Sequence, residues 1–220
     1  MDKRVSPGSE PIVVRRLGRR PYQEVYEAMR GWTHARTQET VDELWLVEHD
    51  PVYTMGRSPL TRNERTEIGG IPVVAVDRGG DMTYHGPGQI VAYPLIDLRR
   101  RGLFVREFVR ILEASVIETL AAFSVPAFVH AGAPGVYAAL AGGSGPFQGE
   151  AKIASLGVHV SRGASYHGLA LNVDMDLRPF SAIAPCGYQA LRVTDMRALG
   201  SGAAPSSVLE KLQEALLARL

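Results

Sequence analysis

The sequence contains one cysteine, Cys186, which lies between Pro185 and Gly187 in a turn where a thiol can be displayed rather than packed. A free thiol has a pKa of about 8.5, so only a few per cent is thiolate at neutral pH. A neighbouring ammonium stabilises the thiolate, and a neutral amine accepts its proton. Cys186 is therefore a candidate nucleophile. The alternative is a cysteine that packs as a small buried hydrophobe.

Lysine is rare in this chain, which makes each lysine worth locating. It occurs only at Lys3, Lys152 and Lys211, and arginine supplies the other basic residues. Lys3 lies near the first residue, and Lys211 belongs to an amphipathic pattern near the last. Lys152 opens an apolar alternating run, where partial burial is expected. Because burial disfavours the charged form of lysine, Lys152 is a candidate base for Cys186.

A third candidate is the stretch Arg78-Gly-Gly-Asp-Met-Thr-Tyr-His-Gly-Pro-Gly-Gln89. Its glycines bend the backbone and let a ligand approach the amides closely. The same stretch carries Arg78, Tyr84 and His85, a combination that an ordinary turn does not need. We predict a ligand-binding turn or hairpin between strands, against the alternative of a surface hairpin.

Other chemistries are disfavoured by the motifs that are missing. The sequence has no phosphate-binding glycine-lysine loop, no dinucleotide fingerprint and no glycine-flanked serine nucleophile. The histidines and Cys186 lack zinc-ligand spacing, so no metal is expected. A net charge of +1 argues against nucleic-acid binding, and no apolar run reaches the length of a membrane span. One cysteine fits a reducing, cytoplasmic location.

Hydrophobic periodicity predicts a mixture of strands and helices. Strands are expected at 12–17, 43–48, 52–57, 71–76, 82–84, 90–96, 135–137, 152–160 and 166–173. Helices are expected after Pro21, at 104–123, at 177–183 and from Ser207, where Ser207 and Glu210 match a capping box. The order lacks a regular βαβ alternation. It predicts one α+β (mixed α/β) domain over 1–220, a mixed sheet flanked by helices, with 1–10 as a disordered lead. The glycine-rich segment 132–149 is expected to be a loop around its short strand.

Five ordered blocks resemble the octanoyl-acyl-carrier-protein:protein octanoyltransferases of lipoate synthesis, in the biotin and lipoate protein ligase superfamily. They are Glu48-His-Asp-Pro-Val-Tyr-Thr-Met-Gly-Arg57, the stretch Arg78–Gln89, Lys152-Ile-Ala-Ser-Leu-Gly157, His167-Gly-Leu-Ala-Leu-Asn172 and Pro185-Cys186-Gly187. The resemblance runs from about Leu44 to Cys186. It implies a mixed sheet with flanking helices, in agreement with the pattern above.

The resemblance also implies the roles of individual residues. By position, Cys186 would carry the acyl group as a thioester, and Lys152 would tune it. The acyl-binding residues would be Arg78, Gly79, Gly80, Asp81, Met82, Thr83, Tyr84, His85, Ser155, Leu156, Gly157, Gly168, Leu169 and Ala170. Amides at 79–80 or 187 are candidates to stabilise the tetrahedral oxyanion.

The implied partners are octanoyl-acyl carrier protein as donor and lipoyl domains as acceptors. The acceptors would be those of 2-oxoacid dehydrogenase complexes and the glycine cleavage H protein, and no cofactor is needed because the donor is already activated. Two alternatives remain at this stage: an ATP-dependent lipoate or biotin ligase, and a non-catalytic module that sequesters acyl groups. Arg99-Arg100-Arg101 and the arginines between 15 and 20 would either dock an acidic carrier protein or be solvated.

Overall fold

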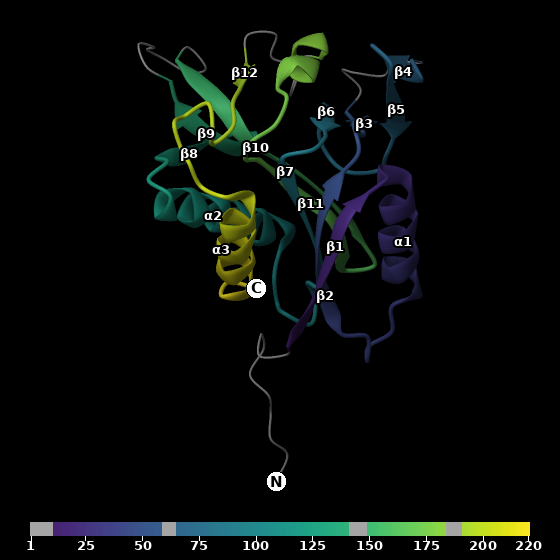
Figure 1. Cartoon of the computed structure of the whole chain (residues 1–220). Helices are drawn as coiled ribbons and strands as arrows, with labels where there is room; N and C mark the ends of the chain where they lie inside the picture. Colours follow the sequence, from purple (N-terminus) through teal and green to yellow (C-terminus); the bar gives the residue numbers. More distant parts are fainter. Residues whose placement is uncertain (1–10, 59–64, 141–148, 184–190) are drawn as a thin grey trace.

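The computed structural model of the chain describes residues 11–58, 65–140, 149–183 and 191–220 (Figure 1). The predicted disordered lead, residues 141–148 of the glycine-rich segment and Cys186 lie outside these ranges. Among the described residues, the elements form a large sheet, a small sheet and helices on both faces of the large sheet.

The large sheet is mixed, which confirms the predicted fold class. In spatial order it contains β1 (Ile12–Arg20), β2 (Asp42–His49), β7 (Gln89–Leu95), β11 (Ala164–Asn172), β10 (Glu150–Ser161), β9 (Ala133–Ala139) and β8 (Ala127–His130). The short strand β12 (Arg192–Val193) adds to β10. β1 is parallel to β2 and β12 is parallel to β10, whereas the other neighbours are antiparallel.

The two faces of the large sheet are covered by different helices. In β2, Leu44 and Leu46 face a core shared with α2 (Val105–Ala122) and α3 (Pro205–Leu217), whereas Trp45 and Val47 face α1 (Tyr22–Ala35). Side chains alternate along a strand, so one apolar strand serves both layers. The helix predicted at 104–123 is confirmed, and Phe108, Leu112, Val116 and Leu120 form its fully buried apolar stripe. Figure 1 shows α1 on one side of the sheet and α2 with α3 on the other.

The small sheet lies beside α1 and supports the predicted ligand-binding stretch. Its order is β4 (Glu67–Ile68), β5 (Ile71–Ala75), β3 (Val52–Met55) and β6 (Met82–His85). A 3₁₀ helix, Arg178–Ala182, packs on β6, where the ring of Phe180 meets the ring of Tyr84 edge-on at 5.5 Å. The stretch Arg78–Gln89 is therefore more than a turn, because β6 runs through its middle.

Several local predictions differ from the structure. The last helix begins at Pro205 after Ala204, so the capping box predicted at Ser207 is wrong. Proline suits the first helical position because its fixed φ is already helical and it has no N–H to leave unpaired. Strand β8 was not predicted, and β9 is longer than expected. None of the described helices is long and apolar enough to cross a membrane.

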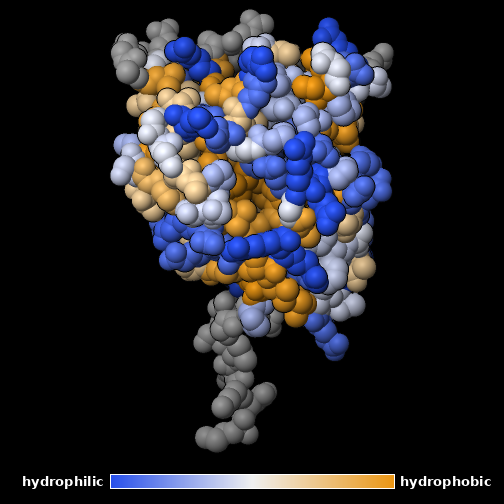
Figure 2. Space-filling model, in the orientation of Figure 1, coloured by the Kyte–Doolittle hydropathy of each residue, from blue (hydrophilic) through white to orange (hydrophobic). Residues whose placement is uncertain are grey.

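The face that carries α3 and the edge strand β1 mixes polar and apolar groups (Figure 2). Figure 2 shows blue hydrophilic patches between orange apolar ones on the face that carries α3 and the edge strand β1. Arginines of β1 pair across this surface, Arg15 with Glu43 and Arg19 with Asp50. The arginines of β1 are therefore at least partly engaged in the fold itself.

Candidate active site

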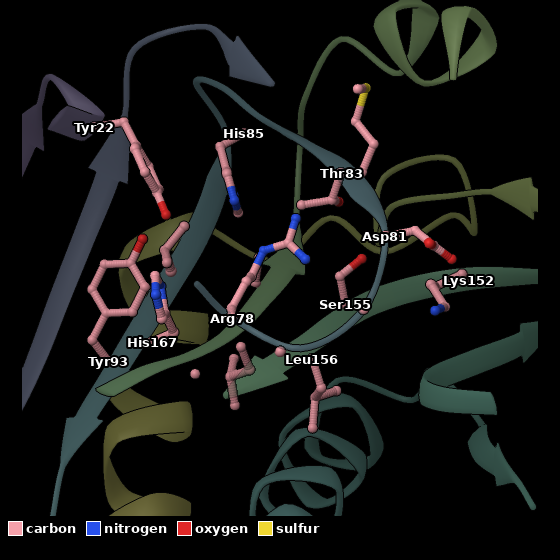
Figure 3. Close-up of a pocket in the computed structure, with 17 residues that line it drawn as sticks. Tyr22, Arg78, Asp81, Thr83, His85, Tyr93, Lys152, Ser155, Leu156 and His167 are labelled. Atoms are coloured by element: carbon pink, nitrogen blue, oxygen red, sulfur yellow. The ribbon is translucent and has the colours of Figure 1, made fainter. Parts of the chain in front are cut away.

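A pocket lies between the large sheet and the chain that leads into β6 (Figure 3). Its floor comes from β7, β10 and β11, and its cover from Arg78 to His85. Twelve of the fourteen predicted acyl-binding residues line it, together with Lys152; Gly79 and Tyr84 do not. The lining residues that sequence reasoning did not name as binding residues are Tyr22, Val91, Tyr93 and His167.

Lys152 is held at one end of this pocket. The residue is only 2% exposed. Its Nζ donates a hydrogen bond to the carbonyl oxygen of Pro134 at 3.0 Å and lies 5.3 Å from the centre of the Tyr137 ring. The carbonyl oxygen of Pro134 accepts a hydrogen bond, and the face of the Tyr137 ring attracts positively polarised N–H groups. Both contacts therefore favour an amine at this point. The expected burial of Lys152 is confirmed.

A carboxylate from α2 lies near Lys152. Glu113 accepts a hydrogen bond from the backbone N–H of Gly135 at 3.3 Å. Burial raises the pKa of Glu113, and the hydrogen bond from Gly135 and the charges of Arg110 and Lys152 oppose that rise. The environment of Lys152 therefore combines a carbonyl, an aromatic ring and a half-buried carboxyl group.

Arg78 crosses the middle of the pocket, between Lys152 and the aromatic end (Figure 3). Its Nη2 donates to the carbonyl oxygen and to Oγ1 of Thr54, at 2.7 and 2.8 Å. A Cβ at Gly157 would lie 2.9 Å from Cδ of Arg78 and 3.0 Å from the carbonyl oxygen of Gly79. The absence of a side chain at Gly157 thus lets the cover approach the floor closely.

Gly79 and Tyr84 are directed to other contacts. The backbone N–H of Gly79 donates to the carbonyl oxygen of Val158 at 3.1 Å, so this amide is already used and does not fit the predicted oxyanion role. The ring of Tyr84 is buried against Tyr53 and Phe180 in a separate apolar cluster. Because neighbouring side chains of a strand alternate, Thr83 and His85 face the pocket and Tyr84 faces away.

Cys186 lies outside the described residues, and the contact predicted between it and Lys152 stays a prediction. The chain is described up to Ile183 and again from Leu191. After Leu191 it forms β12, in which Val193 pairs with Lys152 and Thr194 donates its N–H to the carbonyl oxygen of Lys152 at 3.0 Å. The described chain therefore resumes directly beside the candidate base.

The other end of the pocket is a cluster of aromatic rings and histidines. Tyr22 stacks on His85 at 5.6 Å, and His49 meets Tyr22 edge-on at 5.0 Å. Nδ1 of His49 donates to the carbonyl oxygen of Arg20 at 3.0 Å, so its Nε2 accepts from the hydroxyl of Tyr93 at 2.8 Å in the neutral ring. Burial lowers the pKa of His49 to about 4 and that of His85 to about 3, so both are neutral near pH 7.

Buried hydrogen bonds fix this end to the sheet. Nδ1 of His85 lies 2.7 Å from Oε1 of Gln89, whose Nε2 donates to Oδ1 of Asn172 at 2.9 Å. Asn172 in turn donates to the carbonyl oxygen of Thr194 at 2.9 Å. The network joins β6, β7, β11 and the chain after β12, and satisfied buried networks of this kind hold one arrangement of side chains.

Asp77 attaches the cover to the hairpin of β10 and β11. Its carboxylate accepts hydrogen bonds from Nε2 of His167, at 2.8 Å, and from the hydroxyl of Tyr166, and its carbonyl oxygen accepts from Nδ1 of His159 at 2.8 Å. Burial opposes its ionisation, but the bonds from His167 and Tyr166 hold the pKa of Asp77 well below its ordinary value. His167 has a φ of 59°, an uncommon value for a histidine within a strand.

Asp77 was not singled out from the sequence, because one aspartate after an apolar run carries no distinctive signal. His167 was named only as part of a block. Among the described residues, no three His, Cys, Asp or Glu side chains gather as metal ligands would. The site is therefore built from an amine, a guanidinium, neutral imidazoles and phenols around an apolar slot.

Comparison with known proteins identifies the family. Residues 23–219 match the lipoyl protein ligase A/B catalytic domain. An octanoyltransferase of Burkholderia pseudomallei is 52% identical over 214 residues, which cover 97% of this chain and 85% of the relative. The chain belongs to the lipoyl protein ligase A/B family. The octanoyltransferase of Burkholderia multivorans is similar at 53% identity, covering 96% of this chain and 83% of that protein. The resemblance predicted from the motifs is confirmed, and so is the class of enzyme, an acyltransferase.

Solved structures agree on the family fold. The bipartite lipoate protein ligase of Thermoplasma acidophilum superposes with a TM-score of 0.71 at 16% identity, covering 94% of this chain and 82% of that one. A lipoate-protein ligase A bound with ATP gives a TM-score of 0.68 at 15% identity, covering 94% of this chain and 83% of the other. At such low identity the likeness concerns the fold.

Proposed function

We propose that this chain transfers an octanoyl group from acyl carrier protein to one lysine of a lipoyl domain, through a thioester on Cys186. The observation that carries the proposal is the position of Lys152, which is buried at the end of a pocket lined by the predicted acyl-binding residues. The octanoyltransferases that share half of its residues over nearly the whole chain support octanoyl transfer.

The proposed reaction has two thioester steps and needs no nucleotide. The Cys186 thiolate attacks the acyl carbonyl of the donor, the carrier's thiolate leaves, and it takes up the proton that Cys186 lost. The amine of the acceptor lysine then attacks the Cys186 thioester and loses a proton, and the Cys186 thiol is regenerated. The first exchange is nearly isoenergetic, and the amide formed second lies downhill, so orientation and proton transfer are the main requirements.

Lys152 is proposed as the base of both steps. Pro134 and Tyr137 fix its Nζ at one point. Cys186 lies seven residues before Val193, the backbone partner of Lys152, and an extended chain of that length spans up to about 25 Å. A segment of this length allows the sulfur of Cys186 to reach the amine of Lys152.

The pocket suits the apolar tail of the acyl group. Val91, Leu169 and Ala170 contribute apolar walls, and Tyr22 and Tyr93 bound the end that lies away from Lys152. Each buried methylene stabilises a bound chain by about 0.8 kcal/mol, so the preference for eight carbons should be graded rather than absolute.

The partners are proposed by family likeness. The acceptors would be the lipoyl domains of 2-oxoacid dehydrogenases and the glycine cleavage H protein, and the donor octanoyl-acyl carrier protein. The arginine run 99–101 is a poor docking surface, because Arg101 and most of Arg100 are buried around Asp42.

Two alternative functions differ from this proposal in their chemistry. An ATP-dependent ligase would activate a free acid, and a module that only sequesters acyl groups would need no nucleophile.

The test is intact-mass measurement after incubation with octanoyl-acyl carrier protein and no nucleotide. We expect a covalent octanoyl adduct that disappears in Cys186→Ala and forms slowly in Lys152→Met, whereas Lys211→Met behaves like the native chain. Addition of a lipoyl domain should discharge the adduct. Transfer that requires ATP and a free acid would favour the ligase, and full activity of Cys186→Ala would refute the thioester.

A further inference from the structure

A second hollow lies where α1 ends and the hairpin between β10 and β11 turns. It measures about 610 Å3. The residues that line it include Thr33, Arg36, Arg99, Arg100, Ser161 and Arg162. Lys152 and Ser161 are nine residues apart on the single strand β10, which corresponds to about 30 Å. This hollow is therefore separate from the proposed site of acyl transfer.

Positive charge is concentrated here. Arg36, Arg99, Arg100 and Arg162 line the hollow, and Asp97 is the carboxylate among its lining residues. Behind them Asp42 is fully buried and accepts hydrogen bonds from Arg36, Arg100 and Arg101. The hollow therefore has four lining guanidinium groups but only two neighbouring carboxylates, Asp97 and Asp42. This surplus of positive charge favours an anionic ligand.

The arginines are held in place by the fold. Arg36 donates to the carbonyl oxygen of Leu95 at 3.0 Å, and Arg100 to that of Thr40 at 3.0 Å. Arg162 donates to the carbonyl oxygen of His34. Arg99 lies across Gly163, where a Cβ would come within 2.4 Å of its Nε. Guanidinium groups fixed in this way need little further ordering when an anion binds.

Among the described residues, Oγ1 of Thr33 and Nε of Arg36 are buried and have no hydrogen-bond partner. Thr33 is 3% exposed, and the side chain of Arg36 is 5% exposed. An unsatisfied buried donor is costly, so both atoms favour a ligand that accepts hydrogen bonds.

We propose that this hollow binds a small molecule that carries a phosphate group. A tetrahedral oxyanion offers several acceptors to the guanidinium forks and to the hydroxyls of Thr33 and Ser161. The volume lies within the range of small-molecule sites, about 300–1,000 Å3, and exceeds that of one phosphate, so an organic portion fits as well.

The test uses calorimetric titration of the full chain with adenosine monophosphate and with inorganic phosphate, at constant ionic strength maintained with chloride. We expect saturable one-to-one binding of at least one probe. Tighter binding of the nucleotide would identify an organic phosphate as the ligand, and equal binding would identify free phosphate.

Two variants probe the arginines that lie nearest the surface. Arg99→Gln and Arg162→Asn should each weaken binding about tenfold, because each removes a charge-assisted contact. Asparagine suits position 162, where φ is 51° before Gly163, so the turn should persist. Arg106→Gln removes an exposed charge elsewhere and serves as the control.

The proposal is overturned by three results. The first is the absence of saturable binding of either probe in the millimolar range. The second is equal binding by Arg99→Gln, Arg162→Asn and the control. The third is binding of acyl carrier protein to this hollow while neither small probe binds. Unfolding curves of the variants should match that of the native chain, and acyl transfer should be unchanged, because the hollow is remote from Lys152.

Discussion

The Cβ that Gly135 lacks would lie 2.7 Å from Cε and 2.9 Å from Nζ of Lys152. Gly135 also has a φ of 141°, which residues with a side chain rarely adopt. β9 therefore passes the amine end of Lys152 so closely that only glycine leaves room for it. The position of the candidate base depends on this one residue of the neighbouring strand.

Gly135→Ala should displace the amine without removing it. A misplacement of about 1 Å can cost roughly a hundredfold in rate, and we expect a loss of that order in octanoyl transfer. Single-turnover formation of the acyl adduct measures it. Gly202→Ala is the control, since a Cβ there meets no atom within 4 Å. An unchanged rate in Gly135→Ala would show that the amine is not needed where the structure holds it.

The apolar wall of the pocket gives a prediction about chain length. Ala170 lines the pocket on β11 and is 3% exposed. Ala170→Leu should fill part of the slot and move the preference from octanoyl toward hexanoyl donors, by about fourfold for each excluded methylene. The ratio of kcat/KM for the two donors measures this shift. Ala28→Leu, on the exposed face of α1, should leave the ratio unchanged, and an unchanged ratio in Ala170→Leu would place the acyl chain elsewhere.

Asp77 is predicted to hold the cover of the pocket in place. In Asp77→Asn, one acceptor oxygen becomes an NH2 group that faces donors from Tyr166 or His167. We expect a loss of about 1–3 kcal/mol in the free energy of unfolding and a higher KM for the acyl donor. Urea unfolding and steady-state kinetics measure the two effects. Asp174→Asn, which disrupts the exposed pair with Arg197, should change neither.

Much of the fold could be predicted from periodicity. The apolar stripe of α2 and the strands β10 and β11 could be predicted from residue order, because the spacing of apolar residues follows the period of a helix or the length of a buried strand. The motif blocks located most of the pocket, since glycine and polar residues crowd together where the backbone approaches a ligand. The fold class and the family could be predicted from these patterns alone.

The rest depends on contacts between residues far apart in the chain. Tyr22 opens α1 and Tyr93 lies in the middle of β7, and each sits in an ordinary amphipathic or apolar run. The prediction that Tyr84 binds the acyl group failed for a related reason. Side chains on β6 alternate between two faces, so a continuous motif does not give a continuous pocket lining. Arg100 and Arg101 look like a surface run, and only the fold shows them around Asp42.

The buried histidines predict a loss of stability in weak acid. The pKa of His49 is lowered to about 4 in the folded chain, whereas an unfolded histidine titrates near 6.5. Below pH 6.5 the unfolded chain binds a proton at His49 that the folded chain does not bind. The contribution of His49 to the free energy of unfolding is therefore full above pH 6.5 and falls as the pH drops toward 4. Between pH about 7.5 and about 5.5 the loss should be of the order of 1 kcal/mol for this histidine.

His49→Gln removes this titration. We expect the variant to be less stable than the native chain at neutral pH, since Tyr93 and the carbonyl of Arg20 lose a well-placed partner, but to depend less steeply on pH. Urea unfolding at both pH values gives the slopes. Equal slopes for the variant and the native chain would mean that His49 has the same pKa in the folded and the unfolded chain.

The final prediction concerns Asp42, which is fully buried and receives hydrogen bonds from Arg36, Arg100 and Arg101 and from the backbone N–H of Asp97 at 2.8 Å. Burial by itself would raise the pKa of Asp42, but these bonds and charges hold it below its ordinary value. Asp42→Asn leaves buried guanidinium groups without their counter-charge, a change that costs about 3–5 kcal/mol. Asp50→Asn, which breaks the exposed pair with Arg19, should cost less than about 1 kcal/mol. Thermal and urea unfolding of both variants measure the difference, and similar small losses in the two would show that the arginines around Asp42 are solvated and need no carboxylate.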